Sequence, residues 1–440
     1  MIQKMKGTED ILPGQSYRWQ YVEDLARDLF DSYQFHEIRT PMFEAYELFA
    51  RSVGDTSDIV SKEMYDFYDK GDRHLALRPE GTAPVVRAYV EHKLFGPEYL
   101  KPYKVYYMGP MFRYERPQAG RQRQFHQLGV EVFESSNPAT DVEAIALAWD
   151  FFQELGVRNL KIYINSLGKN EERAQYRQAL IDYFTPLKEQ LSPDSQNRLS
   201  ANPMRIIDSK DPKDQELAIN APKILDYLGE ESKAHFQAVQ DYLQALEIPF
   251  QVDPTIVRGL DYYQDTIFEI IVEDDSIGAQ STVCGGGRYD GLSKQLGGPA
   301  SPGFGFAIGM ERLLLLLDQQ SVEIPEPDPL DLYVLGLGDE VNLVSLQLVQ
   351  AARGEGYSAE RDYLGRSLKS QYKTVDRLNA VLVATVGSNE LESGQLTIKN
   401  QKTGKTFDVQ LSDLLSDFAS YYRKFTQDTS VIDEFFKGGY

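Results

Sequence analysis

The chain has 440 residues, of which 42% are hydrophobic and 26% are charged, and its formal net charge is -21 at pH 7. This composition is typical of a soluble globular protein, and the length predicts two or three domains. The excess of acidic residues argues against general affinity for nucleic acid, so any polyanionic partner must be bound by a local basic patch.

Cysteine and histidine usage indicates the compartment and the metal chemistry. A single cysteine, Cys284, excludes an internal disulfide and suits a reducing cytosol. The five histidines show no ligand-like pairing with it, so no zinc is expected. No apolar run approaches the ~18 residues of a membrane span, and the N-terminus lacks the apolar core of a signal peptide. A cytoplasmic protein without membrane contact is expected.

The first third of the chain predicts a helix, short strands and a hairpin. A helix is expected at about 15–33, with its apolar face formed by Val22, Leu25, Ala26, Leu29, Phe30 and Tyr33. Residues 35–44 read as a strand that Pro41 interrupts, which suits a sheet edge or a bend. A strand, a glycine turn and a helix follow in 73–92. An extended hairpin is predicted at 103–134 and a further helix at 139–156.

The texture of the sequence changes twice after this. Residues 166–245 are helical, charged and polar, and resemble an insertion with a small core of its own. Strand and glycine signals return at 251–309. Three prolines make 323–333 the clearest linker, and an α/β domain of about 100 residues follows. The predicted boundaries are therefore 1–165, 166–245 and 246–322, a linker at 323–330, and a last domain at 331–430.

The hairpin carries the most informative chemistry. Its segment "FRYERPQAGRQRQFHQLGVEVFE" (112–134) holds four arginines between Arg113 and Arg123, with Glu115 as the single acid among them. Guanidinium groups suit phosphate, because they offer a planar fork of donors and stay charged. The sequence therefore predicts a phosphate-bearing ligand, with Phe125 as a platform for a flat base.

Strand alternation divides the hairpin into two faces. One face holds Tyr107, Gly109, Met111 and Arg113 from the first strand and Phe125, Gln127, Gly129 and Glu131 from the second. Polar residues that alternate with aromatic ones favour a face that lines a cavity, where the two glycines leave room for a ligand. A solvated sheet face with a salt bridge is the alternative. The commonest rival nucleotide folds lack support, because "KTGKT" misses the leading glycine of a phosphate loop and "GFGFAIG" has the wrong spacing for a dinucleotide fold.

This hairpin resembles motif 2 of the class II aminoacyl-tRNA synthetases, in the wording of the histidyl-tRNA synthetase family. Further stretches resemble that family in order and spacing: "KGTEDILP" (6–13), "LALRPEGTAPVVR" (75–87), "VRGLDYYQDTIFE" (257–269), "TVCGGGRYDGL" (282–292) and the motif 3-like "GFGFAIGMERLLLL" (303–316). Motifs 2 and 3 alone indicate only the class, whereas "RGLDYY" with "GGRYDGL" is far more specific. The resemblance runs from residue 6 into the last domain and is weakest over the insertion.

The resemblance implies an α+β fold. It consists of an antiparallel catalytic sheet flanked by helices, with the helical insertion and a C-terminal α/β anticodon-binding domain. The implied enzyme is a histidine–tRNA ligase, which forms histidyl-adenylate and pyrophosphate from histidine and ATP and then charges its tRNA. One alternative is a regulatory paralogue of ATP phosphoribosyltransferase that binds histidine without ligase activity. It is disfavoured by the presence of Arg113, Arg258, Arg312, Glu80 and residues 330–430. A synthetase for proline or threonine would lack "RGLDYY".

The resemblance also implies roles for single residues. Arg113, which grips the α-phosphate, and Arg258, which bridges that phosphate and the histidine carboxylate, are the implied catalytic residues. The implied ATP contacts are Arg113, Arg121, Phe125 and Arg312. Of these, Arg312 would hold the far end of the triphosphate and cover the face of the adenine ring that is turned away from Phe125. Mg²⁺ is expected with ATP through phosphate oxygens, without a metal site made by the protein alone.

Histidine needs partners for its ammonium group and for a ring that donates at one nitrogen and accepts at the other. The resemblance implies Glu80, Thr82 and Gln127 at the ammonium end. It implies Glu131, Tyr263 and Tyr289 at the ring, with Tyr262 beside them. Arg113 and Arg258 complete the implied histidine-binding set.

Two basic patches are candidates for tRNA contact. In the hairpin loop these are Arg116, Gln118 and Arg123. In the last domain, Arg366, Lys369, Lys373 and Arg377 form one stripe of a helix expected at 365–378, and Leu368, Tyr372, Val375 and Leu378 form the opposite, buried stripe. A basic stripe can also be no more than a solvated face. The first helix and the strand with Pro41 correspond to motif 1, which implies a symmetric homodimer.

Overall fold

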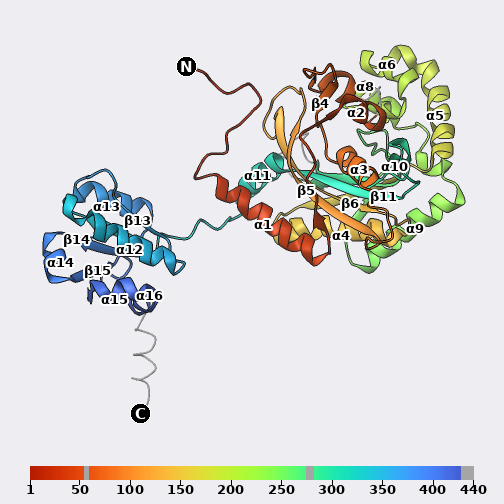
Figure 1. The fold of residues 1–440 in the computed structure, drawn as a ribbon. Helices are drawn as coiled ribbons and strands as arrows, with labels where there is room; N and C mark the ends of the chain where they lie inside the picture. Colours follow the sequence, from red (N-terminus) through yellow and green to blue (C-terminus); the bar gives the residue numbers. More distant parts are fainter. Residues whose placement is uncertain (54–58, 274–281, 428–440) are drawn as a thin grey trace. The chain divides into compact units, whose positions relative to one another are not determined.

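A computed structural model describes residues 1–53, 59–273 and 282–427 (Figure 1). The last residues of the predicted C-terminal domain, 428–430, lie outside the described residues. The chain divides into two compact units, residues 1–325 and 326–440, and the division falls within the predicted linker at 323–330. Over the described residues, no helix combines the length and the apolar character that crossing a membrane requires.

The larger unit is built on one sheet. In the described residues its strand order is β1-β5-β6-β11-β10-β9-β7-β8, antiparallel except for the outer pairs β1/β5 and β7/β8. The strands are β1 (His36–Glu37), β5 (Tyr103–Phe112), β6 (Gln124–Phe133), β7 (Leu160–Ser166), β8 (Phe250–Val252), β9 (Gln264–Val272), β10 (Thr282–Arg288) and β11 (Gly303–Gly309). The predicted hairpin at 103–134 is confirmed as β5 and β6, the longest strands of the sheet.

One face of this sheet is covered by helices and forms the main hydrophobic core. These helices are α1 (Ser16–Ser32), α4 (Pro138–Glu154), α9 (Glu230–Ala245) and α11 (Met310–Gln319). Figure 1 shows α1, α4 and α9 along the same side of the sheet. The apolar positions of β6 alternate as predicted, since Leu128, Val130 and Val132 all point into this core. Helix α4 begins where the Asn137 side chain accepts a hydrogen bond from the amide of Ala139, with proline as its first residue.

The opposite face of the sheet carries a second apolar cluster and stays partly open. Helix α3 (Thr82–Glu91) and helix α10 (Leu292–Gln295) lie on this side, together with α2 (Tyr46–Val53), η1 (Ile59–Glu63) and a small sheet in the order β2-β4-β3. These strands are β2 (Phe43–Ala45), β3 (Asp66–Tyr68) and β4 (His74–Leu77). Pro41 separates β1 from β2, so the predicted interruption of the strand at 35–44 is confirmed.

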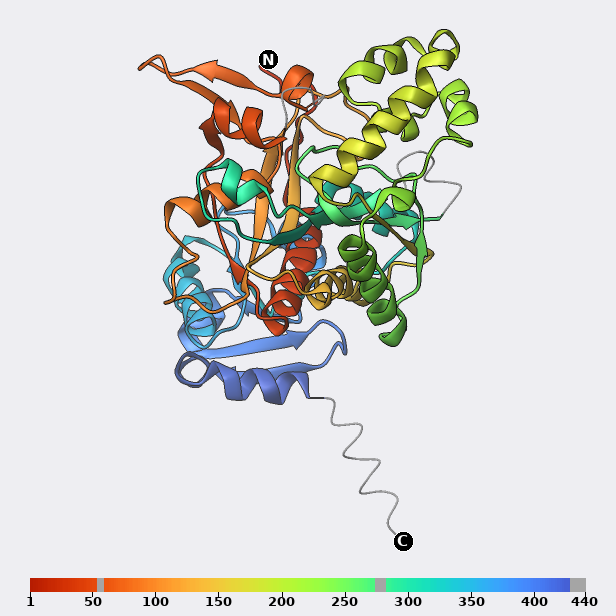
Figure 2. The same cartoon turned by 90° about the vertical axis from the view of Figure 1, so that its right-hand side faces the viewer.

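The helices after β7 form a group with its own core. They are α5 (Asn170–Phe184), η2 (Thr185–Gln190), α6 (Pro193–Ala201), α7 (Met204–Ile207), α8 (Pro212–Ala218) and η3 (Ile224–Tyr227). Their shared core contains Tyr176, Leu180, Phe184, Leu191, Leu199, Ile206, Ala221 and Ile224. Figure 2 shows α5 to α8, in yellow to light green, gathered apart from the green α9. Helix α9 lies within the predicted insertion, yet it packs on α4 in the main core.

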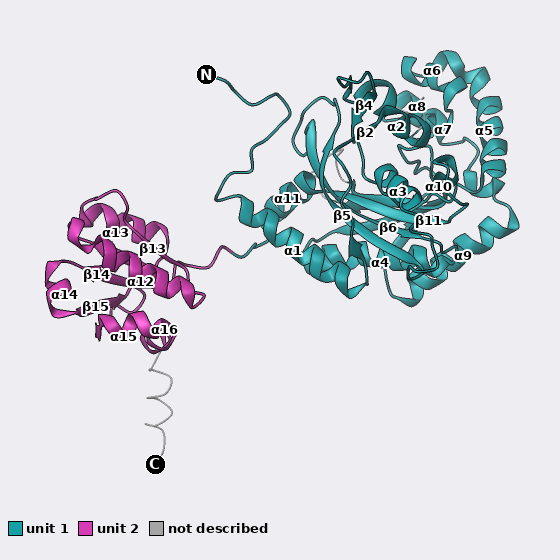
Figure 3. Ribbon diagram, in the orientation of Figure 1, with its two compact units in different colours: residues 1–325 teal, residues 326–440 magenta. Residues whose placement is uncertain are grey.

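The smaller unit, shown in magenta in Figure 3, is an α/β domain. Its sheet order is β13-β12-β14-β15-β16, with a parallel first half and an antiparallel second half. The strands are β12 (Leu332–Gly336), β13 (Ala359–Arg361), β14 (Leu382–Val386), β15 (Gln395–Asn400) and β16 (Thr406–Gln410). The helices are η5 (Asp339–Val341), α12 (Asn342–Gly354), α13 (Leu368–Arg377), α14 (Ser388–Ser393), α15 (Leu411–Ser416) and α16 (Phe418–Thr426).

Candidate active site

The open face of the β5–β6 hairpin forms the floor of a pocket. The strands pair with Tyr107 opposite Gly129 and Met111 opposite Phe125, so the side chains that alternation grouped together do lie on one face. Tyr107, Phe125 and Gln127 line the pocket. The Oε1 atom of Gln127 is buried and has no hydrogen-bond partner among the described residues, which leaves an acceptor for a ligand.

The expectation that the two hairpin glycines leave room for a ligand is wrong. A Cβ added at Gly129 would collide with the Tyr107 ring, and one added at Gly109 would lie 2.7 Å from an Nη atom of Arg78. The space beside both glycines is therefore filled by side chains of the protein. The glycines instead allow the Tyr107 ring and the Arg78 guanidinium to approach the strands closely.

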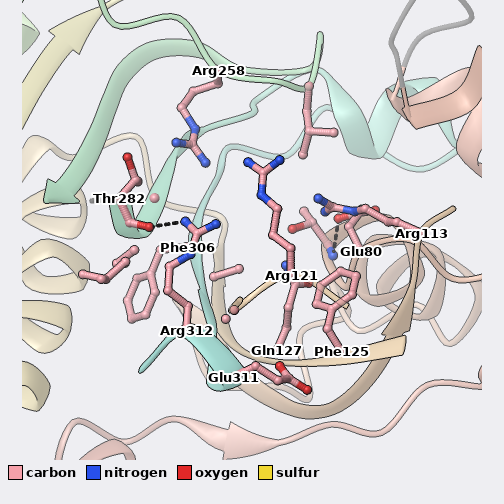
Figure 4. Close-up of a pocket in the computed structure, with 18 of the residues that line it drawn as sticks. Glu80, Arg113, Arg121, Phe125, Gln127, Arg258, Thr282, Phe306, Glu311 and Arg312 are labelled. Carbon is pink, nitrogen blue, oxygen red and sulfur yellow. Dashed lines mark hydrogen bonds between the residues drawn. The ribbon is translucent and has the colours of Figure 1, made fainter. Parts of the chain in front are cut away.

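Four guanidinium groups line the pocket from separate segments. Arg113 follows β5, Arg121 lies in the hairpin loop, Arg258 precedes β9, and Arg312 lies in the first turn of α11. Figure 4 shows all four pointing into one space. In a chain of net charge -21, such a gathering of positive charge favours an anionic ligand.

Arg113 and Arg121 are held at the mouth of the hairpin. Arg113 Nε donates to the carbonyl oxygen of Pro79 at 2.8 Å, and its guanidinium lies over the Phe125 ring, 5.1 Å from the centroid. Glu115 forms ion pairs with Arg113 at 3.7 Å and with Arg121 at 3.4 Å. About half of the Arg121 side chain is exposed, so its charge is the more movable one.

Arg258 and Arg312 are connected through β9 and β10. Arg258 Nη1 donates to Glu269 Oε1 at 2.5 Å, and Thr282 Oγ1 donates to Glu269 Oε2 at 3.1 Å. Arg312 Nη1 donates to the carbonyl oxygen of Thr282 (Figure 4). Burial works against the charge of Arg258, but Glu269 and Tyr263 outweigh it and raise the pKa of Arg258. Burial and the nearby Arg121 lower the pKa of Arg312.

Glu80 is a buried carboxylate at one end of the pocket. It accepts hydrogen bonds from the backbone amides of Thr82 at 2.7 Å and Ala83 at 2.9 Å, in the first turn of α3. Burial raises the pKa of Glu80, and these two amides and Arg113 act in the opposite direction. Arg113 is one cation near Glu80, and a further cation beside this carboxylate, such as the ammonium group of a ligand, would be stabilised.

Glu131 lies beneath the floor and does not line the pocket. It is fully buried and accepts hydrogen bonds from Thr82 Oγ1 at 2.6 Å and Tyr289 Oη at 2.5 Å. Burial raises the pKa of Glu131 to about 8, against the effect of these two donors. Tyr289 lies beneath the pocket as well, whereas Thr82, Tyr262 and Tyr263 line it. Burial also raises the pKa of Tyr263 to about 12, while Arg258 acts against the rise.

The sequence models of two known families match the chain. The model described as histidyl-tRNA synthetase matches residues 7–313, and the model described as anticodon binding domain matches residues 331–420. The first match alone spans more than half of the chain. The chain belongs to the histidyl-tRNA synthetase family.

The chain is also similar to proteins named histidine–tRNA ligase, and the similarity covers almost the whole length of each. A histidine–tRNA ligase of Streptococcus pyogenes serotype M1 is 57% identical over 419 residues, which are 95% of this chain and 98% of that protein. One of Streptococcus agalactiae serotype III is 57% identical over 425 residues, 96% of this chain and 99% of that protein. The solved structure of apo Staphylococcus aureus histidyl-tRNA synthetase is 41% identical with a TM-score of 0.81, covering 95% of this chain and 100% of that one. The predicted α+β fold of a class II synthetase with an anticodon-binding domain is confirmed.

The sequence did not predict the contacts that three acidic residues make at or behind the pocket wall. Glu269 holds Arg258. Glu311 accepts from the backbone amide of His126 at 2.9 Å and from its Nδ1 at 2.9 Å, and Glu115 pairs with two arginines. Each lies inside a stretch that resembles a family motif, but nothing in the sequence marks it as a partner. Among residues 1–53, 59–273 and 282–427, no group of three or more potential metal-ligating side chains is found.

The hairpin residues proposed for tRNA contact differ in their surroundings. Arg116 and Gln118 are exposed on the loop. The Arg123 guanidinium instead lies over the Tyr114 ring, 3.9 Å from the centroid, and its Nε donates to the carbonyl oxygen of Glu115 at 3.2 Å. Arg123 thus supports the base of the loop, whereas the other two are the accessible ones.

In the smaller unit the predicted basic helix is α13. Lys369, Lys373 and Arg377 are exposed on it. Two details of the prediction are wrong. Arg366 lies before the helix and pairs with Asp362, and Leu378 is 38% exposed because it follows the last helical residue instead of packing beneath it.

Proposed function

We propose that the chain is a histidine–tRNA ligase, which activates L-histidine with ATP and transfers it to the 3′ end of its tRNA. The observation that carries this proposal is the gathering of Arg113, Arg121, Arg258 and Arg312 around one pocket that also contains Glu80. One site therefore offers charge for a triphosphate and a carboxylate for an α-ammonium group.

The first step joins the histidine carboxylate to the α-phosphorus of ATP and releases pyrophosphate. The carboxylate is already an anionic nucleophile, so the step needs no general base. The protein must hold two anions in line and stabilise the charge that develops on phosphorus. Arg113 would bind the α-phosphate, and Arg258 would bridge it and the histidine carboxylate. Both side chains are held by neighbours before any ligand binds, which lowers the cost of orienting them.

The remaining ATP contacts follow from position. Phe125 lies on the pocket floor below Arg113, and we assign the adenine ring to its face. Arg312 would hold the far end of the triphosphate, because it lines the opposite wall beside Thr282. Arg121, on the exposed loop, would add a contact once the nucleotide is bound.

The histidine end requires polar partners of both kinds. Glu80, Thr82 and Gln127 would bind the ammonium group. Tyr262 and Tyr263 line the pocket beside them. Glu131 and Tyr289 lie beneath the floor and would be the polar groups on that side of the imidazole ring. A buried site that pairs both ring nitrogens disfavours analogues without them by ~10⁴ or more, because its own polar groups would lose their partners.

Mg²⁺ would accompany ATP. The pocket's carboxylates are dispersed, with Glu115 pairing arginines and Glu311 accepting from His126, so the residues fit a cation held mainly by phosphate oxygens. When bound, Mg²⁺ would neutralise phosphate charge. The chain's own residues would position the nucleotide and the amino acid around it.

The second step needs tRNA. Arg116 and Gln118, which are exposed beside the pocket, would contact the acceptor end of the tRNA. In the anticodon-binding domain, the tRNA would be contacted by Lys369, Lys373 and Arg377 of α13. We further propose a cytoplasmic homodimer, in which α1 and the strands around Pro41 contribute to the two-fold interface.

ATP–pyrophosphate exchange with each amino acid in turn tests the proposal. We expect exchange with histidine alone, followed by charging of tRNA for histidine. Exchange with proline or threonine would overturn the assignment of histidine as the substrate. Histidine binding without any exchange would favour the regulatory paralogue of ATP phosphoribosyltransferase, which the curated names of full-length relatives and the anticodon-domain match argue against.

A further inference from the structure

The loop that carries Arg258 and Tyr263 forms a thin wall between two cavities. Residues 253–263 contain no helix or strand. Arg258, Leu260, Tyr262 and Tyr263 line the proposed active site on one side. Arg258 and Leu260 also line a second cavity, together with residues of α5 and of the turn between α6 and α7. Ile256, Tyr262 and Tyr263 of this loop are buried in an apolar cluster, and polar contacts hold the backbone between them.

Arg173 of the insertion supplies the first of these contacts. It lies in the first turn of α5. Its Nη1 donates to the carbonyl oxygen of Tyr263, and its Nη2 lies 3.4 Å from the carbonyl oxygen of Asp261. A rigid guanidinium fork that spans two carbonyls two residues apart fixes the direction of the backbone between them.

Asn202 and Arg205 supply further contacts from the other side of the insertion. Asn202 Nδ2 donates to the Asp261 side chain at 3.3 Å, and Arg205 Nη2 donates to the carbonyl oxygen of Gly259 at 3.2 Å. Beside them, Met204 packs against both the insertion core and the cluster that contains Tyr262 and Tyr263. The insertion thus contacts the backbone at 259, 261 and 263.

The start of the insertion is tied to the end of the same loop. The amide of Leu167 donates to the carbonyl oxygen of Asp265 at 2.8 Å, and the amide of Asp265 donates to that of Gly168 at 3.1 Å. Gln264 Nε2 donates to Asn170 Oδ1 at 3.2 Å. Helix α5 therefore starts from a fixed point beside the loop, which places Arg173 within reach of it.

We propose that Arg173, supported by Asn202 and Arg205, is a positioning residue for amino-acid activation: it holds the backbone of 259–263 so that Arg258 and Tyr263 face the histidine site. The inference rests on the proposed function and gives the insertion a role in the first reaction step. Arg173 touches no substrate. It acts through the loop, where a displacement of about 1 Å can cost ~10²-fold in rate.

The test compares Arg173→Ala and Arg173→Lys with the control Arg177→Ala. Arg177 lies one turn further along α5 and also donates to two carbonyls, those of Ser200 and Ala201, but both lie within the insertion. Steady-state ATP–pyrophosphate exchange gives KM for histidine, KM for ATP and kcat, and thermal unfolding reports stability.

For Arg173→Ala we expect a rise in histidine KM and a fall in kcat, on the order of tenfold or more each, with ATP KM close to that of the wild type. Lysine should restore part of the loss, because it keeps one donor but not the fork. Arg177→Ala should keep all three kinetic values near those of the wild type.

Two results would overturn the inference. One is an Arg173→Ala enzyme whose histidine KM and kcat match those of Arg177→Ala. The other is an equal rise in both KM values together with a lower unfolding temperature than that of Arg177→Ala, which would indicate a general structural role. Absence of histidine-dependent exchange in the wild type would contradict the proposed function itself. That result differs from the two above, which concern only the role of Arg173.

Discussion

Arg258 and Glu269 form an ion pair of 2.5 Å across the wall of the pocket. The carboxylate of Glu269 also accepts from Thr282, whose carbonyl oxygen accepts from Arg312. Two of the four guanidinium groups that line the pocket, Arg258 and Arg312, are thus connected through one carboxylate and one threonine. Because each arginine is fixed by a neighbour, the pocket can present its charge to a triphosphate without first ordering long side chains.

Replacing Arg258 tests the arginine that we place between the α-phosphate and the histidine carboxylate. We expect Arg258→Ala to lower histidine-dependent ATP–pyrophosphate exchange by ~10²-fold or more, as for the loss of one transition-state donor. The unfolding temperature should fall as well, because Glu269 keeps Thr282 as a hydrogen-bond partner but loses the cation that pairs with its charge, so exchange is measured well below the unfolding transition. Unchanged turnover in this variant would refute the role given to Arg258.

Gly285→Ala tests the same guanidinium without removing it. A Cβ at Gly285 would collide with the end of the Arg258 side chain. That side chain is flexible, so the collision is relieved by moving the guanidinium away and not by shifting the strand. We therefore expect a loss of exchange comparable to that of Arg258→Ala, with a nearly normal unfolding temperature.

Gly354→Ala is the matched control for this substitution. Gly354 ends α12, and a Cβ there meets nothing within 4 Å. Exchange and stability should both stay at the wild-type level. Full activity of Gly285→Ala would mean that Arg258 reaches its substrate from another position.

Glu131 should make stability depend on pH. Its folded pKa of about 8 is above the ordinary value for glutamate, so the folded chain keeps a proton that the unfolded chain releases. The stability that the protonated group contributes is fully present below its ordinary pKa and is lost as pH rises through about 8, by at most about 1.4 kcal/mol per pH unit. Glutamine does not titrate. The unfolding temperature of Glu131→Gln, relative to the wild type, should therefore rise between pH 5.5 and 8.5, and a constant difference would show that Glu131 is ionised when folded.

The same substitution should separate the two substrates. Thr82 and Tyr289 both donate to Glu131, whereas glutamine offers one acceptor oxygen and one donor group to them. One of the two hydroxyls would have to turn and accept from the amide instead of donating, which disturbs the contact that holds Thr82, and Thr82 lines the histidine end of the pocket. We expect histidine KM to rise about tenfold or more while ATP KM stays near the wild-type value. Equal changes in both would count against Glu131 as a determinant of histidine binding.

How far the sequence predicts the site depends on the range of the contact. Strand alternation correctly placed Tyr107, Phe125 and Gln127 on one face, because the period of a strand is a local property. Alternation does not report what fills the space above that face. Tyr107 closes the gap beside Gly129, and Glu131, at the deep end of the same row, is covered by Thr82 and Tyr289 from distant segments.

Partners that are distant in the sequence stay invisible to patterns of this kind. Arg312 binds a carbonyl oxygen 30 residues away, and Arg173 reaches Tyr263 across 90 residues. Helical periodicity likewise suggested one basic stripe from Arg366 onward, but α13 begins only at Leu368. Arg366 precedes the helix and pairs with Asp362, a contact that periodicity does not report.

The exposed lysines of α13 provide the test for tRNA. We expect Lys369→Ala/Lys373→Ala to lower charging of tRNA, with a weaker dependence on salt than in the wild type, because two phosphate contacts would be lost. Histidine-dependent exchange should stay unchanged, since the pocket residues lie in residues 1–325. The matched control is Lys402→Ala/Lys405→Ala, which removes two exposed lysines of the same unit at the turn between β15 and β16. Equal charging by the two double variants would show that α13 is only a solvated face of the domain.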